Sequence, residues 1–434
     1  MQYNLYFKRE KCFSLKKVSL VITLAIFFVF AALNGVQAVN KKPISQKIPV
    51  TRAATVKLPV GKPVQSFFTA QNLPLLRERN LKYQGAFRVP ATESNGSSFH
   101  YGGTAISYNP DHDSLFIVGH DWHQKLSEVK VPQIVDSNKL SDLKTATVLQ
   151  SFADVFDDKK SSVDSGNVKV GGTYVYRHKL YSTAYSYYDA DNSQKLSHIY
   201  SPFTLEFKND ARGVFQVGSL GAGFVSGYMT DIPSVWQGLL GGPSLTGQCC
   251  LAIIGRTSSG PAAFVFDPND LGLRESASAT PLVYYPLDHA TLGKWGETGN
   301  KYNGSTMMAG AVFPKSMRSL IFFGRQGVGT WCYGTGAECG DPVNSSKGGH
   351  AYPYKYQIWA YDARDFLKAK NKQVNPWDVM PYDVRSFDLP FATENKELGG
   401  VTYDARKDRI FVSQKYGDGN MPVIHIFSVR ADIF

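Results

Sequence analysis

A repeated pattern of apolar strands and polar turns dominates the chain after about residue 100. In the first copy, a glycine-rich run at Gly102–Tyr108 is followed by a polar turn and a strongly apolar run at Ser114–Gly119. Runs of this length, rich in Val, Ile, Tyr and Phe, predict β-strands, and self-similarity along the chain predicts a repeat architecture. Four further copies begin at Gly171, Gly227, Met308 and Gly399.

Each copy continues into a third strand, and all but the last also have a fourth. The third strands are expected at Leu126–Pro132, Ser197–Pro202, Ala262–Pro268, Gln357–Asp362 and Val423–Val429. Instead of a fourth strand in the fifth copy, the run Tyr83–Pro90 precedes the first copy and resembles Val384–Pro390, the fourth strand of the fourth copy. A strand from the opposite end of the chain would remove the open edge between the first and last blades of a ring.

We therefore predict an all-β fold, a five-bladed β-propeller of four-stranded blades over residues 80–434, with an N-terminal strand that closes the last blade. The mean repeat of about 71 residues exceeds the 40 to 50 of simple propeller repeats, so six blades remain an alternative. The third copy is degenerate, with strands expected at Gly227–Thr230 and Leu251–Gly255 and a short inserted helix at Pro233–Leu240.

The N-terminal region is predicted to be a signal peptide over residues 1–38. Basic residues precede the apolar run Val18–Leu33, and Val36-Gln37-Ala38 is a small-x-small cleavage pattern. The run is shorter than the roughly 20 residues that span a bilayer, although an uncleaved anchor is the alternative. The pattern predicts a secreted or periplasmic protein with no membrane span after cleavage, expected to be a monomer.

The net positive charge of the chain comes from its first 79 residues. The formal net charge is +11, and the basic excess falls within the first 79 residues, so that residues 80–434 are balanced. Residues 39–79 are basic and rich in Pro and Val without a repeating pattern, which predicts an extended linker that does not fold by itself. The balanced remainder argues against nucleic-acid binding.

Four cysteines follow the signal peptide. Cys332 and Cys339 flank a short flexible stretch and are predicted to form a disulfide, which would contribute roughly 2 to 3 kcal/mol on the loop-entropy estimate. Cys249 and Cys250 are adjacent, so a vicinal bridge, two buried thiols or cross-links to the other pair remain open.

Loops between second and third strands open on one face of a propeller, and here they are polar and aromatic. The longest spans about residues 324–355 and is expected to form a lid or wall over a central pocket. Residues expected to bind a ligand on this face are His120, Trp122, His123, Tyr187, Tyr188, Arg256, Arg325, Trp331, His350, Lys415 and Tyr416.

Aromatic faces beside charged side chains are typical of carbohydrate recognition. A glycoside hydrolase also needs two carboxyl groups, roughly 5 to 5.5 Å apart for retention or 6.5 to 9.5 Å for inversion, and Asp121, Asp189 and Glu397 are the candidate catalytic acids. The repeats over residues 81–429 resemble secreted bacterial propeller proteins of unassigned function, and the architecture resembles five-bladed propeller glycosidases. The resemblance implies a fold and an extracytoplasmic location but no activity, and no catalytic residue is carried over from the glycosidases. The polar and aromatic face itself predicts a hydrolase or related lyase acting on a glycan or another small polar ligand; a non-catalytic glycan- or protein-binding propeller is the alternative.

Metal binding is a weaker interpretation. His120 and His123, with Asp121, His100 or His350, could supply ligands. The stretch from Asp189 begins like a calcium loop, but Gln194 and Tyr200 stand where such a loop needs Gly and Glu. No cofactor is therefore expected.

Overall fold

The structure is a computed structural model that describes residues 70–164, 166–189, 191–206, 210–248, 255–299 and 301–431. The predicted signal peptide, residues 39–69 of the predicted linker, and Cys249 and Cys250 lie outside these ranges. Within them, no helix has the length and apolar character that crossing a bilayer requires.

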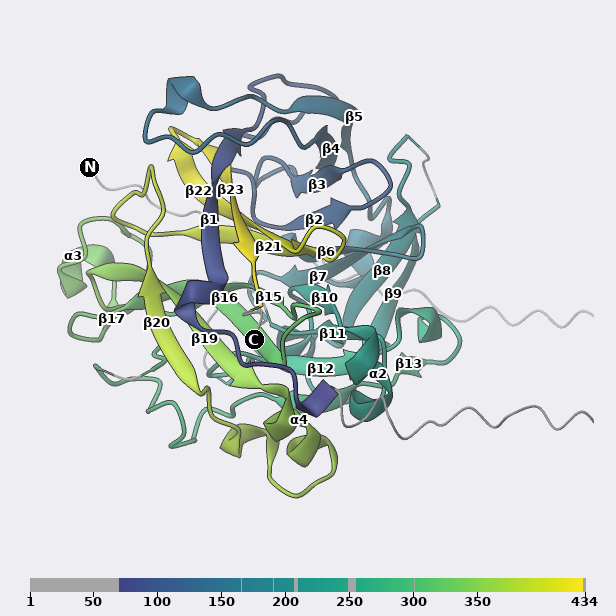
Figure 1. Cartoon of the computed structure of the whole chain (residues 1–434), viewed down its shortest axis with the longest axis vertical. Helices are drawn as coiled ribbons and strands as arrows, with labels where there is room; N and C mark the ends of the chain where they lie inside the picture. Colours follow the sequence, from purple (N-terminus) through teal and green to yellow (C-terminus); the bar gives the residue numbers. More distant parts are fainter. Residues whose placement is uncertain are drawn as a thin grey trace, which may run out of the picture. The chain divides into compact units, whose positions relative to one another are not determined.

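The strands form five antiparallel blades, which confirms the predicted five-bladed β-propeller and excludes the six-bladed alternative (Figure 1). The first blade contains β2 (Ile106–Asn109), β3 (Ser114–Val118), β4 (Leu126–Lys130) and β5 (Thr147–Ala153). The second contains β6 (Val168–Tyr176), β7 (Lys179–Ser186), β8 (Leu196–Pro202) and β9 (Arg212–Val217), with the short parallel β13 (Ser276–Ala277) added at β9. The fourth contains β15 (Met307–Val312), β16 (Ser319–Gly327), β19 (Tyr354–Asp362) and β20 (Asp383–Phe387).

The last blade is closed by the N-terminal strand, as predicted. Its order is β1-β23-β22-β21, so that β1 (Leu81–Arg88) is the outer strand next to β23 (Met421–Val429), β22 (Arg409–Asp418) and β21 (Leu398–Asp404). The pairing runs from Leu81 opposite Val429 to Arg88 opposite Val423. In Figure 1, β1 (purple) lies beside β23 (yellow), so the first and last strands of the described chain join in one sheet.

The third blade differs from its prediction. It contains β10 (Met229–Asp231), β11 (Ser244–Thr246), β12 (Ala263–Phe266) and β14 (Thr280–Val283), with the predicted helix present as α2 (Ser234–Leu240). Of the second strand expected at Leu251–Gly255, residues 251–254 lie outside the described residues. In the described part of this blade, β11 is the strand that pairs with both β10 and β12. Three consecutive residues suffice for it because its side chains are all buried, and so short a run carries little periodic signal.

Apolar clusters between neighbouring blades hold the ring together. In β3, Leu115 and Ile117 pack toward the fifth blade, whereas Phe116 and Val118 pack toward the second. Successive side chains of a strand point to opposite faces, so a blade between two others buries both. This explains why the second strands read as continuous apolar runs.

Residues 70–80, just before the first strand, pack against the propeller. Ala70 and Leu76 are fully buried, and Leu76 N–H donates to Ser319 Oγ at 2.9 Å. Arg318 Nη1 donates to Leu73 O at 2.6 Å, and Arg364 Nε to Gln71 O at 2.8 Å. Residues 70–80 thus pack along the fourth blade because that blade supplies hydroxyl and guanidinium groups for their backbone.

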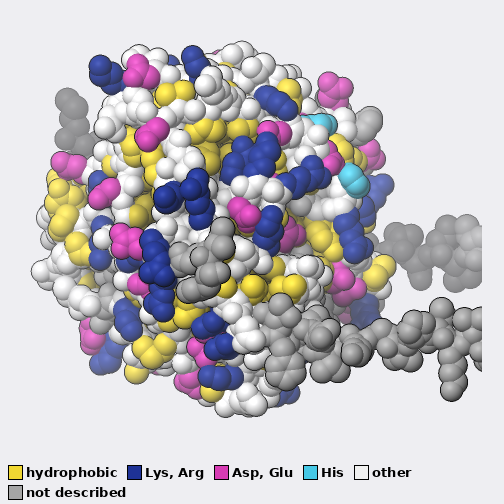
Figure 2. All heavy atoms as spheres, in the orientation of Figure 1, with side chains coloured by type: hydrophobic (Ala, Val, Ile, Leu, Met, Phe, Trp, Pro, Cys, Tyr) yellow, Lys and Arg dark blue, Asp and Glu magenta, His cyan; other side chains and the backbone are white. Residues whose placement is uncertain are grey.

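Short helices occupy the connections. They are α3 (Gly336–Cys339), α4 (Ala363–Lys370) and the 3₁₀ turns Glu78–Asn80, Leu140–Asp142, Lys159–Ser162, Ala222–Phe224, Pro268–Asp270 and Pro376–Asp378. A two-stranded hairpin of β17 (Cys332–Gly334) and β18 (Gly348–His350) lies between β16 and β19. On the face shown in Figure 2, basic and acidic side chains are interspersed.

Candidate functional site

The axis of the propeller is closed by the backbone of its first strands. Residues from the first strand of every blade line a space of only about 10 Å³. Glycine is required there: a Cβ atom on Gly171 would lie 1.8 Å from Ser226 O, and one on Gly399 would lie 1.7 Å from Gly103 O. The repeated glycine pairs therefore mark where adjacent blades meet, and a ligand on one face cannot pass to the other.

A pocket of about 470 Å³ opens on the face formed by the loops between second and third strands. We call it the central pocket. The residues that line it are Tyr187, Tyr188, Arg256, Trp295, Gly304, Ser305, Thr306, Met307, Arg325, Tyr333, Asn344, Ser346, Lys347, Gly348, Gly349 and Glu397. Five of them, Tyr187, Tyr188, Arg256, Arg325 and Glu397, were predicted from the sequence.

A charged cluster forms one wall of the central pocket. Glu397, just before β21, accepts a hydrogen bond from Lys415 Nζ at 2.7 Å and one from Asn395 Nδ2 at 2.5 Å. Arg325, near the end of β16, is 4% exposed; its Nη1 donates to Asn395 O at 3.1 Å and lies 3.8 Å from Glu397 Oε1. The guanidinium also stacks over the ring of Tyr354 at 4.1 Å.

The cluster keeps Glu397 ionised. Burial alone would raise the pKa of this carboxyl, but the charges of Lys415 and Arg325 outweigh burial and hold the pKa below its ordinary value. Conversely, burial lowers the pKa of Lys415, and Glu397 more than restores it. A general acid needs a raised pKa, so Glu397 is suited to accepting hydrogen bonds or acting as a base rather than to donating a proton.

The other two candidate acids do not line the central pocket. Asp121 forms an ion pair with Lys169, whose ammonium lies 5.6 Å from the centre of the Tyr187 ring. Asp189 Oδ1 accepts the backbone N–H of Ser193 at 2.9 Å and that of Gln194 at 3.3 Å, as in a side-chain-capped turn. Asp189 lines a neighbouring hollow of about 400 Å³ that shares Tyr188 with the central pocket.

His120 and His123, in a loop of the first blade, do not line the central pocket. The rings of His120 and His123 are 4.7 Å apart, and His120 contacts Tyr101, which in turn contacts Tyr416. Trp122 is 85% exposed and does not line the central pocket. In the part of the chain that the structure describes, no three His, Cys, Asp or Glu side chains are grouped as metal ligands would be.

A disulfide-bonded hairpin forms the opposite wall. Cys332 and Cys339 are bonded, as predicted, and β17 pairs with β18 so that Cys332 lies opposite His350. Tyr333, Asn344, Ser346 and residues 347–349 of this segment line the central pocket. The long loop is therefore a wall, as expected. Trp331 is not among the residues that line the pocket, but its ring lies 5.2 Å from that of Trp295, which does line it.

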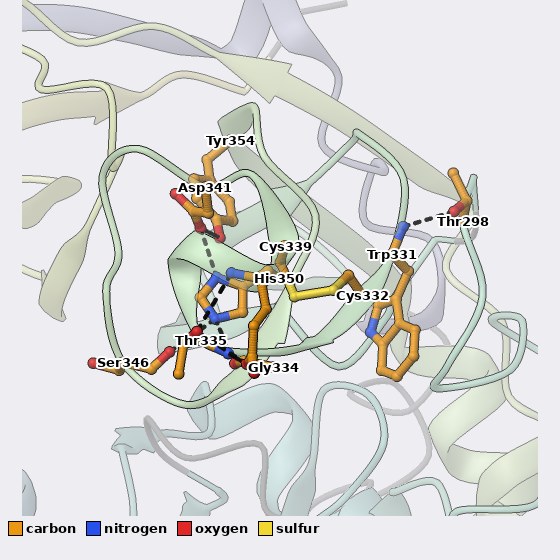
Figure 3. Close-up of a disulfide and its surroundings, with 11 residues drawn as sticks. Thr298, Trp331, Cys332, Gly334, Thr335, Cys339, Asp341, Ser346, His350 and Tyr354 are labelled. Carbon is orange, nitrogen blue, oxygen red and sulfur yellow. Dashed lines mark hydrogen bonds and ion pairs between the residues drawn. A yellow bond between two sulfur atoms is a disulfide. The ribbon is translucent and has the colours of Figure 1, made fainter.

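His350 is an internal support of this wall rather than a ligand-binding side chain. It is 1% exposed, and its Nδ1 lies 2.8 Å from Asp341 Oδ2 (Figure 3). Its Nε2 donates to the carbonyls of Ser346, at 2.9 Å, and Gly334, at 3.1 Å. Asp341 also accepts the hydroxyl of Tyr354. All of these partners lie in the hairpin or at the start of β19, so His350 does not reach the pocket.

The buried contact between Asp341 and His350 predicts that the stability of the protein depends on pH. Burial raises the pKa of Asp341, but hydrogen bonds from His350, Tyr354 and two backbone amides outweigh it, so its pKa lies below the ordinary value. A carboxyl with a lowered folded-state pKa stabilises the protein above its unfolded pKa of about 3.9, and this stability is lost as pH falls through the folded pKa. We expect Asp341→Asn to cost about 2 kcal/mol at neutral pH, with the difference from the unmodified protein shrinking as urea denaturation is repeated at pH values stepped down below about 4. A difference that does not change with pH would contradict the lowered pKa of Asp341.

The sequence did not identify several pocket residues. Trp295, Ser305 and Thr306 come from the connection between β14 and β15, and Tyr333, Asn344 and Lys347 come from the hairpin wall. Connections into first strands open on the same face as the loops between second and third strands. The unusual length of the segment before Met307 was therefore the signal that could have drawn attention to Trp295.

The chain matches no protein-family model and no curated protein. Among solved structures, it is similar to a glycosyl hydrolase from Bacteroides ovatus, with 9% identity over 83% of this chain and 99% of that one and a TM-score of 0.40. It is also similar to an endo-arabinase from Bacteroides thetaiotaomicron, with 12% identity over 79% and 97% of the two chains and a TM-score of 0.39. A third similar structure is hydrazine synthase of Kuenenia stuttgartiensis, with 9% identity over 72% of this chain and 61% of that one and a TM-score of 0.29. This chain therefore spans less than two thirds of that one. At these scores the likenesses say nothing of activity or substrate.

Proposed function

We propose that this protein is a glycan-binding propeller that holds a saccharide in the central pocket. The observation that carries the proposal is a pocket of about 470 Å³ in which three tyrosines and a tryptophan stand beside hydrogen-bonding groups. Tyr188 and Tyr333 are 74% and 55% exposed, respectively. Exposed aromatic faces can stack on sugar rings, and the hydroxyl, amide and charged groups around them can bind sugar hydroxyls.

The arrangement of carboxyl groups favours binding over hydrolysis. Among the described residues that line the central pocket, Glu397 alone has a carboxyl group, and its lowered pKa is opposite to what a general acid needs. Asp121 is engaged by Lys169, and Asp189 caps its own turn. A hydrolase would require a second carboxyl group to enter the pocket with the substrate.

The proposed location is outside the cytoplasm, in the periplasm or the medium. The Cys332–Cys339 bond supports this, because structural disulfides persist in oxidising compartments. The apolar run near the N-terminus supports it from the sequence.

Binding and hydrolysis are separated by one experiment. The purified chain is incubated with a panel of polysaccharides, and both retention on the polymer and release of reducing ends are measured. We expect retention without new reducing ends. Release of reducing ends that Glu397→Gln abolishes would identify a hydrolase, and failure to retain any polymer would overturn the proposal.

Two tyrosines provide the site-specific test. We expect Tyr188→Ala and Tyr333→Ala each to weaken binding of a short oligosaccharide at least about tenfold, or 1.4 kcal/mol, because each removes an exposed ring from the central pocket. Isothermal titration calorimetry measures the change. Trp122→Ala is the matched control, since Trp122 is exposed but outside the pocket. Loss of binding in that control alone would place the site on the first blade instead.

A further inference from the structure

The charged wall of the central pocket contains two buried cations, Lys415 and Arg325, beside the carboxylate of Glu397. Lys415 and Arg325 share the carboxylate of Glu397. That carboxylate accepts its hydrogen bonds from Lys415 and Asn395. The guanidinium of Arg325 lies 3.8 Å from it and donates instead to neutral oxygens of Asn395. Arg325 is therefore a buried cation without a direct hydrogen bond to an anion.

The neighbouring carboxylates are already engaged. Asp121 is paired with Lys169, and Asp341 is held by His350 and Tyr354. In addition, the buried Nε of Arg325 has no hydrogen-bond partner. Burying a cation is costly unless a charge or hydrogen bonds compensate, so the wall is incomplete by itself.

Two further cations line the same pocket from different elements. Arg256 comes from the loop between β11 and β12, and Lys347 from the hairpin wall just before β18. Guanidinium and ammonium groups that converge on one cavity are the groups that bind carboxylates and sulfates. With Arg325, they place three cationic side chains from different elements around the pocket.

We infer that the central pocket selects an acidic saccharide, one that carries a carboxylate or a sulfate group. The inference rests on the proposed glycan-binding function and specifies the class of glycan. The anionic group would lie against the Arg325 wall and complete its charge balance, while the sugar ring stacks on the exposed tyrosines. A neutral sugar would leave Arg325 without a direct hydrogen bond to an anion.

Matched pairs of polymers test the inference. Polygalacturonate and alginate are each compared with their carboxyl-reduced counterparts, and chondroitin sulfate is compared with desulfated chondroitin; the affinities are measured by calorimetry at low and high salt. We expect at least one acidic polymer to bind tenfold or more tightly than its neutralised counterpart, with the preference falling as salt screens the charges. The pair that shows the preference distinguishes carboxylate from sulfate.

Lys347, which is exposed, and Arg256, which is half-buried, supply variants that remove no side chain of the buried wall. Lys347→Gln and Arg256→Gln are expected to weaken binding of the acidic form several-fold, and more than binding of the neutral form, so that the preference for the acidic form falls. Arg274→Gln, an exposed residue in the connection after β12, is the matched control and is expected to change neither. Equal affinity for acidic and neutral forms would overturn the inference and leave glycan binding intact. Absence of binding to every polymer would overturn both.

Discussion

Gly399→Ala is expected to destabilise the propeller by about 3 kcal/mol or more, or to prevent folding. A Cβ atom at this position would lie 1.7 Å from Gly103 O and 2.6 Å from the carbonyl carbon. The backbone of Gly103 cannot easily move away, because Gly400 N donates to the same oxygen at 3.1 Å and Gly103 has a φ of +77°. The substitution therefore has to separate the first strands of the first and last blades.

Urea denaturation of the purified chain measures this effect. The matched control is Gly238→Ala in α2, where an added Cβ would meet nothing within 4 Å. Alanine in a helix interior is favoured over glycine by roughly 0.5 to 1 kcal/mol, so this control should be as stable as the unmodified protein or slightly more stable. If Gly399→Ala unfolded within about 0.5 kcal/mol of that control, the close contact at the axis would be wrong.

The same glycines explain why the fold could be predicted from the sequence. Adjacent first strands approach so closely that any residue other than glycine would clash. For this reason a glycine pair recurs in the sequence, at Gly171-Gly172 and at Gly399-Gly400. Because both faces of each blade are buried, a continuous apolar run recurs in the sequence of each copy. These constraints are local and recur in each blade, so a single sequence displays them. In the third blade the described second strand is only Ser244–Thr246, too short for a periodic signal, and most of the run predicted for it lies outside the described residues.

The site was predicted less completely because its geometry depends on contacts between distant segments. Residue type and loop order correctly brought Arg325 and Glu397 to one pocket, although β16 and β21 belong to different blades. The sequence could not show that Asp189 caps its own turn or that His350 is buried against Asp341. A polar side chain in a loop has the same sequence signature whether it faces a ligand or supports the loop from inside.

Phe87→Ala is expected to cost about 3 to 5 kcal/mol, because it removes a large core side chain from the strand that closes the ring. Phe87 is fully buried in β1 and packs in the cluster between the fifth and first blades with Ile106 and Leu115. Its strand joins the last blade through its pairing with β23, in which Phe87 lies opposite Ile424. The substitution thus weakens both the core and the attachment of the closing strand.

Gln84→Ala in the same strand is the matched control. Gln84 is exposed, and its side chain bonds to the carbonyls of Lys82 and Tyr83, so its loss is expected to change stability by less than about 0.5 kcal/mol. Urea denaturation followed by tryptophan fluorescence compares the two variants. Because the described tryptophans lie outside the fifth blade, a fluorescence midpoint that falls with Phe87→Ala would show that opening the closing strand unfolds the other blades as well. An unchanged midpoint, with new proteolytic cleavage confined to β1, would mean instead that the remaining blades keep their structure without the closure.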